Sequence, residues 1–191
     1  KKNPEPLLYQ GLKNLEYRGY DSAGFVTVEQ NKTTRPIREI GEVSHLLPHI
    51  NQDSTACVGI GHTRWATHGG VTKENTHPHH SMNKEVYLVH NGIIENYKIL
   101  AEKLAKAGYT FYGQTDSEVL ANLIEYCLKS THDIKKAILL ALSQVTGTYG
   151  LAIVAPSDPT RLYAVRRGSP LMMSTIEDGI MVASDPHAFP E

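Results

Sequence analysis

The sequence lacks most of the features that would place it in a specialised class of protein. It has only two cysteines, Cys57 and Cys127, without CxxC spacing, which argues against a disulfide framework or a thiolate zinc site. No apolar run approaches the ~18 residues of a membrane span, and residues 1–15 lack the apolar region of a signal peptide. The formal net charge is only -1, which provides no electrostatic footprint for nucleic acid or an anionic membrane. We therefore expect one soluble, cytoplasmic domain that binds neither.

The 191 residues instead carry a mixture of helix and strand patterns. Strands do not alternate regularly with helices, so stacked antiparallel sheets with helices outside, an α+β arrangement, fit better than a parallel doubly wound sheet. Apolar spacing and capping residues predict helices at about 5–16, 94–107, 115–129 and 133–145. Thr115 and Glu118 form a capping box that begins the third of these helices. Apolar runs between turn residues predict strands at 24–28, 35–40, 56–61, 85–90, 149–155, 161–165, 171–174 and 179–183.

Polar residues and glycines crowd the predicted strand ends, as they do where loops bind or react. Arg64 suits bidentate recognition of a carboxylate or phosphate, and stacking on Trp65 is an equally good reading from chemistry alone. Asn91-Gly92 could donate an amide and a backbone N–H to an oxyanion, or form an ordinary turn. Asp116 could stabilise a helix N-terminus, or face a cation such as a substrate ammonium group.

The ten histidines, five of them between His62 and His80, raise the alternative of a metal site. Neither His62 with His68 nor the 77–80 cluster has the spacing of a zinc motif such as HExxH, so we rank metal below loop-structuring and substrate-proximal hydrogen bonding. The two cysteines are poor candidates for a nucleophile, because both lie in apolar patterns typical of a core.

Five segments in register carry a resemblance to a known family. They are LEYRGYDSAG (15–24), HTRWATHG (62–69), NTHPH (75–79), VHNGIIEN (89–96) and TDSE (115–118). Together they closely resemble the glutaminase domain of glutamine–fructose-6-phosphate aminotransferases, which are class II glutamine amidotransferases. The YRGYDS form favours this family over the related purine and asparagine amidotransferases. The resemblance covers nearly the whole chain, 1–191, and implies an N-terminal-nucleophile hydrolase fold, a four-layer αββα sandwich with two stacked antiparallel sheets.

The resemblance also implies hydrolysis of glutamine to glutamate and ammonia, with the ammonia passed to fructose 6-phosphate to make glucosamine 6-phosphate. No cofactor or metal is expected, and the parent enzyme is expected to be a homo-oligomer. The catalytic residues it implies are Asn91 and Gly92 as the oxyanion hole and Arg18 and Gly19 at the nucleophile end. The substrate-binding residues it implies are Arg64 for the α-carboxylate, Asp116 for the α-ammonium, Trp65, Thr67 and His68 in a loop that closes over glutamine, and His77 near the passage to the sugar site.

The nucleophile of this family is an N-terminal cysteine, which attacks the amide while its own α-amine serves as base. This sequence begins with Lys1, and its match starts at the helix that follows the cysteine-bearing strand. We therefore expect that strand to precede Lys1 and a sugar isomerase domain to follow Glu191. The alternatives are a catalytically inactive, glutamine-binding regulatory domain, or the glutaminase domain of a related purine or asparagine amidotransferase.

Overall fold

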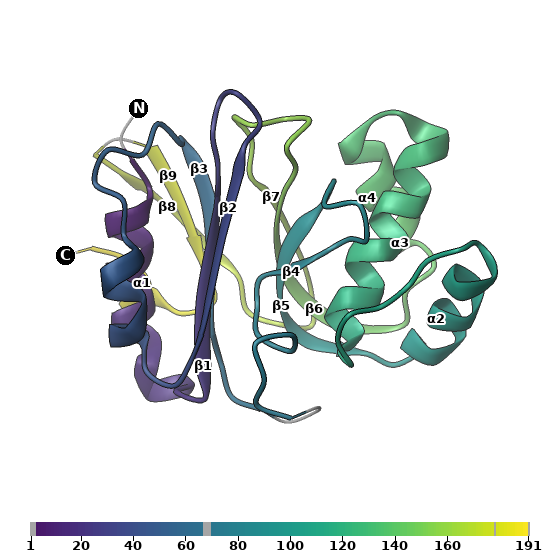
Figure 1. Ribbon diagram of the computed structural model, residues 1–191, viewed down its shortest axis with the longest axis horizontal. Coiled ribbons are helices and arrows are strands. Elements are labelled where there is room, and N and C mark those ends of the chain that lie inside the picture. The colour runs from purple at the N-terminus through teal and green to yellow at the C-terminus, as the bar shows by residue number, and fades with distance from the viewer. Residues whose placement is uncertain (1–2, 67–69, 178, 191) are drawn as a thin grey trace.

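The computed structural model describes residues 3–66, 70–177 and 179–190, which form helices and antiparallel sheets arranged in four layers (Figure 1). The first layer holds helix α1 (Glu5–Leu15) with the 3₁₀ segments η1 (Glu16–Arg18) and η2 (Val43–His49). Next come a sheet with strand order β2-β1-β3 and a sheet with order β4-β5-β6-β7. The fourth layer contains α2 (Tyr97–Lys106), α3 (Asp116–Thr131) and α4 (Ile134–Leu142). The expected αββα sandwich is confirmed.

The first sheet consists of β1 (Ser22–Val28), β2 (Thr34–Ile40) and β3 (Val58–Arg64), with β1 in the middle. All seven β1 residues are buried, because both faces of this strand are covered. Successive side chains point to opposite faces of a strand. Phe25 accordingly packs with Leu46 on the α1 side, whereas Val26 joins the core between the two sheets.

The second sheet consists of β4 (His79–His80), β5 (Tyr87–Ile94), β6 (Gly147–Val154) and β7 (Tyr163–Arg167). Its outer face packs against α3, whose Leu120, Leu123 and Ile124 are fully buried with Leu151 from β6. Thr115 caps α3 as predicted, since its side chain accepts a hydrogen bond from the Glu118 backbone N–H.

A buried acid anchors helix α1 to the first sheet. Glu5 is fully buried, and its carboxylate lies 2.7 Å from an Arg35 guanidinium nitrogen on β2. Thr27 of β1 and the backbone N–H of Asn51 also donate to this carboxylate. These partners compensate for the burial of the charge and fix the helix that forms one wall of the cavity described below.

Several predicted boundaries are wrong in ways that matter for the site. The strand expected at 56–61 continues to Arg64, because β1 pairs with it along its whole length from Val28↔Val58 to Ser22↔Arg64. The strand expected at 85–90 continues through Asn91-Gly92 to Ile94, so this pair is not a turn, and the next helix begins only at Tyr97. His79 and His80, expected in a loop, form the short strand β4.

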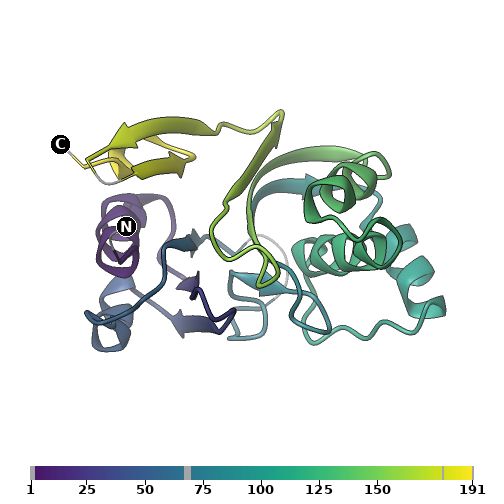
Figure 2. The same cartoon turned by 90° about the horizontal axis from the view of Figure 1, so that it is seen from above.

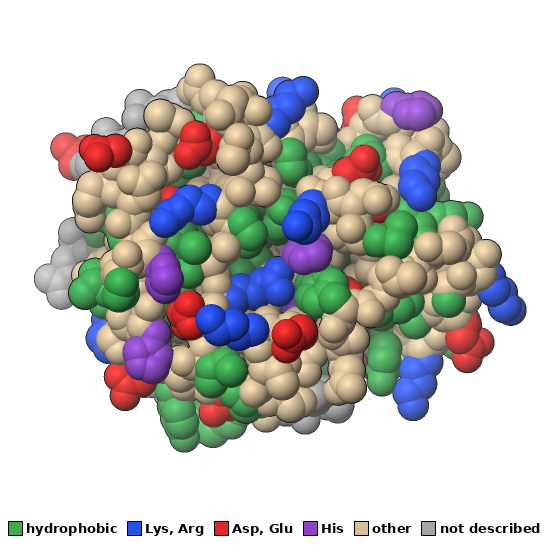
Figure 3. Space-filling view, viewed as in Figure 1, with side chains coloured by type: hydrophobic (Ala, Val, Ile, Leu, Met, Phe, Trp, Pro, Cys, Tyr) green, Lys and Arg blue, Asp and Glu red, His purple; other side chains and the backbone are tan. Residues whose placement is uncertain are grey.

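The chain ends with the hairpin β8 (Met172–Ile176) and β9 (Gly179–Ala183) and the 3₁₀ segment η3 (Pro186–Ala188). The hairpin is a separate two-stranded ladder beside α1, which Figure 2 shows from above. On the face in Figure 3, acidic and basic side chains are interspersed, in line with the low net charge. Within the described ranges, no helix is long and apolar enough to span a membrane.

Candidate functional site

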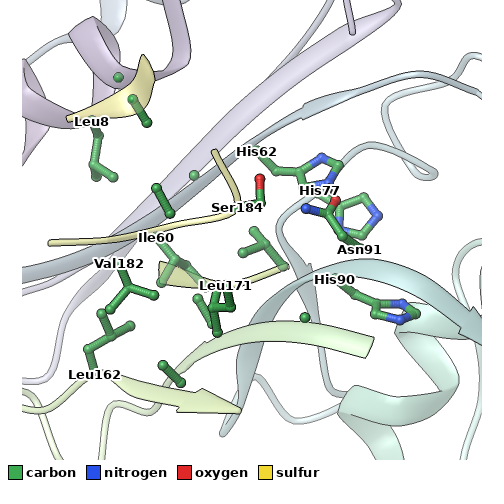
Figure 4. A pocket seen from close by; sticks show the side chains of 18 of the residues that line it. Leu8, Ile60, His62, His77, His90, Asn91, Leu162, Leu171, Val182 and Ser184 are labelled. Atoms are coloured by element: carbon green, nitrogen blue, oxygen red, sulfur yellow. Dashed lines mark hydrogen bonds between the residues drawn. The ribbon is translucent and has the colours of Figure 1, made fainter. Parts of the chain in front are cut away.

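A cavity of about 1110 Å³ lies between the two sheets, bounded by α1, β3 and β9 on one side and by β5 and β6 on the other. Most of its wall is apolar, with side chains such as Leu8, Ile60, Leu162 and Val182 (Figure 4). One end of the cavity is polar (Figure 4). His62 of β3, His90 and Asn91 of β5, and His77 of the segment before β4 lie there. Seven of the predicted site residues line this cavity: Arg18, Arg64, Trp65, His77, Asn91, Gly92 and Asp116.

Arg64 is the last residue of β3, and it is held in place by residues around Asp21 and by Gly70. Arg64 is only 6% exposed, and its Nη1 donates a hydrogen bond to the Gly70 carbonyl over 3.1 Å. The Asp21 backbone N–H donates to the Arg64 carbonyl, and the Asp21 carboxylate accepts from the Ala66 N–H. Gly19 lies so close that an added Cβ would stand 2.9 Å from the Arg64 carbonyl carbon. Burial lowers the pKa of Arg64, whereas Asp21 raises it.

Asn91 and Gly92 lie within β5, and their surroundings fix both residues. Asn91 Oδ1 is 2.8 Å from His62 Nε2 on the facing strand β3. Gly92 has φ +134°, and a Cβ there would stand 2.2 Å from the Thr148 carbonyl oxygen. Only glycine fits this backbone and this contact. The arrangement can present an amide and the adjacent peptide unit to the cavity.

Asp116 is the first residue of α3, and one of its oxygens is already committed to the fold. Oδ2 accepts from the Ile94 backbone N–H at the end of β5 over 2.8 Å. Oδ1 lies 3.3 Å from Ser117 Oγ and 3.9 Å from His90 Nδ1, and the side chain is 23% exposed. His90 itself is buried, which lowers its pKa. Asp116 therefore reaches the same cavity as Arg64 with the opposite charge.

His62, His77 and His79 pack ring against ring. The His62 and His77 rings stack with centroids 4.2 Å apart, and His79 meets His77 edge-on at 4.5 Å. His79 Nε2 lies 3.1 Å from the hydroxyl of Thr115, the cap of α3. Burial lowers the pKa of each ring, that of His62 to about 4. In the described parts of the chain, no three His, Cys, Asp or Glu residues cluster as metal ligands would.

The remaining predicted residues lie around the polar end of the cavity or fall outside the described residues. Trp65 is 59% exposed and contacts Tyr20. Arg18 pairs with Asp185, 3.1 Å away, and Tyr17 donates to the same carboxylate. Thr67 and His68 lie outside the described residues, so their predicted roles stay predictions.

Neither cysteine is close to Asn91. Cys127 is buried in the helical core, and burial raises the pKa of its thiol. Cys57 is half-buried rather than a core residue, and it lines the opposite end of the cavity. It precedes His62 by five positions of an extended segment, which is a separation of about 16 Å. No described thiol can therefore attack a substrate held at Asn91.

Four layers with two facing antiparallel sheets, and a polar site where β3 and β5 meet, define the N-terminal-nucleophile hydrolase class of fold. Two solved structures share it: glutamine phosphoribosylpyrophosphate amidotransferase from B. subtilis (TM-score 0.83, 28% identity, 98% of this chain and 41% of that chain), and an allosteric regulatory enzyme of purine biosynthesis (TM-score 0.82, 30% identity, 97% and 40%).

A family model for the glutamine amidotransferase domain matches residues 62–191, and the chain belongs to this family. Glutamine–fructose-6-phosphate aminotransferase (isomerizing) from Bacteroides thetaiotaomicron is 46% identical over 188 residues, covering 97% of this chain. The enzyme of the same name from Pseudomonas putida is 47% identical over 185 residues, covering 96%. The chain spans about 30% of the length of each of these relatives.

Sequence reasoning missed residues that act on the site through other residues. Loop structuring and substrate-proximal hydrogen bonding are the roles predicted for the histidines of this loop. The contact of His62 with Asn91 was not predictable, because it forms only where β3 and β5 of the two sheets face each other. Asp21 and Asp185 were given no role, although each holds a predicted site residue or its neighbour. The YRGYDS segment offers a signal for Asp21, because an acid beside turn residues is a common hydrogen-bond acceptor.

Proposed function

We propose that this domain hydrolyses glutamine to glutamate and ammonia. The observation that carries the proposal is that Arg64, Asp116 and Asn91 line the same cavity. A zwitterionic amino acid needs a cation for its α-carboxylate and an anion for its α-ammonium, and charge-assisted hydrogen bonds of this kind are the strong ones. The side-chain amide of such a ligand then lies beyond its charged end, where an oxyanion donor has to act. Asn91 is suited to that task.

In the proposed reaction, an N-terminal cysteine thiol attacks the amide carbon, and the cysteine α-amine takes the thiol proton. The carbonyl electrons move to oxygen, which Asn91 Nδ2 stabilises by a hydrogen bond. Collapse of this intermediate breaks the C–N bond, and the proton on the α-amine passes to the leaving nitrogen, so that ammonia departs. Water then attacks the thioester, releasing glutamate and restoring the thiol.

We propose that the strand bearing this cysteine occupies the cavity between β3 and β9. In the described residues β3 pairs with β1 on one side only, so its other edge offers backbone hydrogen-bonding groups. The apolar wall suits a strand that is buried on both faces. The seven residues of β3 extend about 20 Å, which a strand of six or so residues spans. The first residue of that strand would meet Asn91 at the polar end.

We further propose that the ammonia is passed to fructose 6-phosphate to make glucosamine 6-phosphate, as the names of the relatives imply. That step needs a sugar isomerase domain, which we place in the same polypeptide. We refer to this whole protein as the full-length enzyme, and we propose that it is a cytoplasmic homo-oligomer. Glutamine and fructose 6-phosphate are then its two substrates.

The test is glutamate release from L-glutamine by the full-length enzyme, compared with a variant whose N-terminal cysteine is alanine. We expect saturable release that the alanine variant abolishes. Saturable glutamine binding without turnover would instead support a regulatory domain and overturn the proposal.

A further inference from the structure

The side chain of His62 makes one well-defined hydrogen bond, and it is to the predicted oxyanion residue. His62 Nε2 on β3 lies 2.8 Å from Asn91 Oδ1 on β5, across the polar end of the cavity. Figure 4 shows both side chains there, with His77 beside them. The fold, rather than a neighbouring sequence position, creates this contact, because 29 positions separate the two residues.

Burial keeps the His62 ring neutral at ordinary pH, with its pKa lowered to about 4. A neutral imidazole has one N–H, so the ring either donates from Nε2 or accepts at Nε2. If Nε2 donates, Asn91 keeps Oδ1 toward the histidine and turns its NH₂ group to the cavity. If Nε2 accepts, the amide must be reversed, and an oxygen faces the cavity.

The other ring nitrogen decides between these arrangements. His62 Nδ1 is buried without a hydrogen-bond partner in the described structure. A proton on Nδ1 would make a buried N–H donor without an acceptor. Such donors are rarer in proteins than buried acceptors without a donor. The proton therefore lies on Nε2.

The ring is also prevented from turning over. His77 stacks on it at 4.2 Å with an angle of 23° between the planes, and His79 buttresses His77 edge-on. His77 is itself only 6% exposed. A second, buried ring against one face opposes a rotation that would exchange the donor with Nδ1 or a ring carbon.

We propose that His62 is a positioning residue that sets the orientation of the Asn91 amide, so that Nδ2–H faces the carbonyl oxygen of the substrate. This inference rests on the proposed function. Within the described residues, Asn91 Nδ2 has no hydrogen-bond partner, as a donor reserved for a ligand requires. His62 touches no reacting atom and acts only through Asn91.

The test compares three substitutions of His62 in the full-length enzyme. Glutamine places an amide NH₂ near the position of Nε2, whereas asparagine is too short to reach it and leucine cannot donate. We expect H62N and H62L to lower kcat for glutamine hydrolysis roughly 10- to 100-fold, with KM changed less than about threefold. We expect H62Q to stay within about fivefold of the wild type. H45N, which changes an exposed histidine of η2, is the matched control.

A double-mutant cycle separates positioning from a merely structural role. In an N91A background, H62L should change kcat by less than about twofold, because the group it orients is gone. Equal kcat for H62N and wild type, or a full loss by H62L on top of N91A, would overturn the inference. H62N carries the test if leucine disrupts folding. Absence of turnover in the wild type itself would instead overturn the proposed function.

Discussion

The charge of Asp116 is the part of the site that can be perturbed with least damage to the fold. In D116N, the remaining amide oxygen can still accept from the Ile94 N–H, which is the 2.8 Å bond that ties α3 to β5. The negative charge is lost, together with the 3.3 Å hydrogen bond that Ser117 Oγ donates to Oδ1. At a helix N-terminus that charge contributes about 0.3–1 kcal/mol to stability. We therefore expect the free energy of unfolding of D116N to fall by no more than about 1 kcal/mol.

The expected loss in binding is larger. A hydrogen bond to a charged group contributes about 1.5–3 kcal/mol, which corresponds to roughly 10- to 150-fold in affinity. The substrate's ammonium group is bound in both the ground state and the transition state. The KM for glutamine should therefore rise by this factor, while kcat changes less than about threefold.

The assay is steady-state glutamate release by the full-length enzyme, with D133N as the matched control. Asp133 is also an acid at a helix N-terminus, where it caps α4, but it lies outside the cavity. Glutaramate, which is glutamine without its α-ammonium group, provides a second control. The wild type should strongly prefer glutamine to glutaramate, and D116N should lose most of that preference. A KM increase below about threefold, or the same increase in D133N, would refute the assignment of Asp116.

Three further measurements test the oxyanion donor, the backbone at Gly92 and the burial of His62. N91A should lower kcat for glutamine hydrolysis by about 10²–10³, with little change in KM, and an unchanged kcat in folded enzyme would reject the oxyanion role. G92A should lower the free energy of unfolding in urea by at least about 2 kcal/mol, because φ is +134° and the new Cβ would meet the Thr148 carbonyl. G108A should lower the free energy of unfolding by less, because Gly108 has φ +89° but no atom within 4 Å of an added Cβ. Equal losses in G92A and G108A would contradict this reasoning. The free energy of unfolding should fall as the pH drops from 6.5 toward 4, because the pKa of His62 is lowered on folding and the unfolded chain binds more protons in that window. The decline should be shallower in H62Q, and an identical pH profile would show that His62 is not buried as described.

The existence and order of the longer helices and strands were predictable from the sequence, because apolar periodicity and capping residues report local structure, whereas the two-residue strand β4 was not. Thr115 caps α3 as its spacing predicted. Strand ends were not predictable, because they depend on partners that are distant in sequence. Arg64 belongs to β3 because it pairs with Ser22 of β1, and Asn91 belongs to β5 because it pairs with Gly150 of β6.

The candidate site was also predictable from the sequence only in part. Motifs identified Arg64, Asn91 and Asp116, and the fold brings all three to one cavity. The role of His62 followed only from the facing of β3 and β5, since no sequence spacing relates it to Asn91. The half-buried position of Cys57 was likewise missed, because its apolar neighbours suggested a core although they line a cavity.

We propose that glutamine is hydrolysed at the polar end of this cavity with Asn91 as an oxyanion donor. The most direct measurement is kcat for glutamate release from L-glutamine by the full-length enzyme and by N91A at saturating glutamine. We expect turnover by the wild type and a loss of kcat of about 10²–10³ in N91A. No turnover by the wild type, or equal turnover by both proteins, would contradict it.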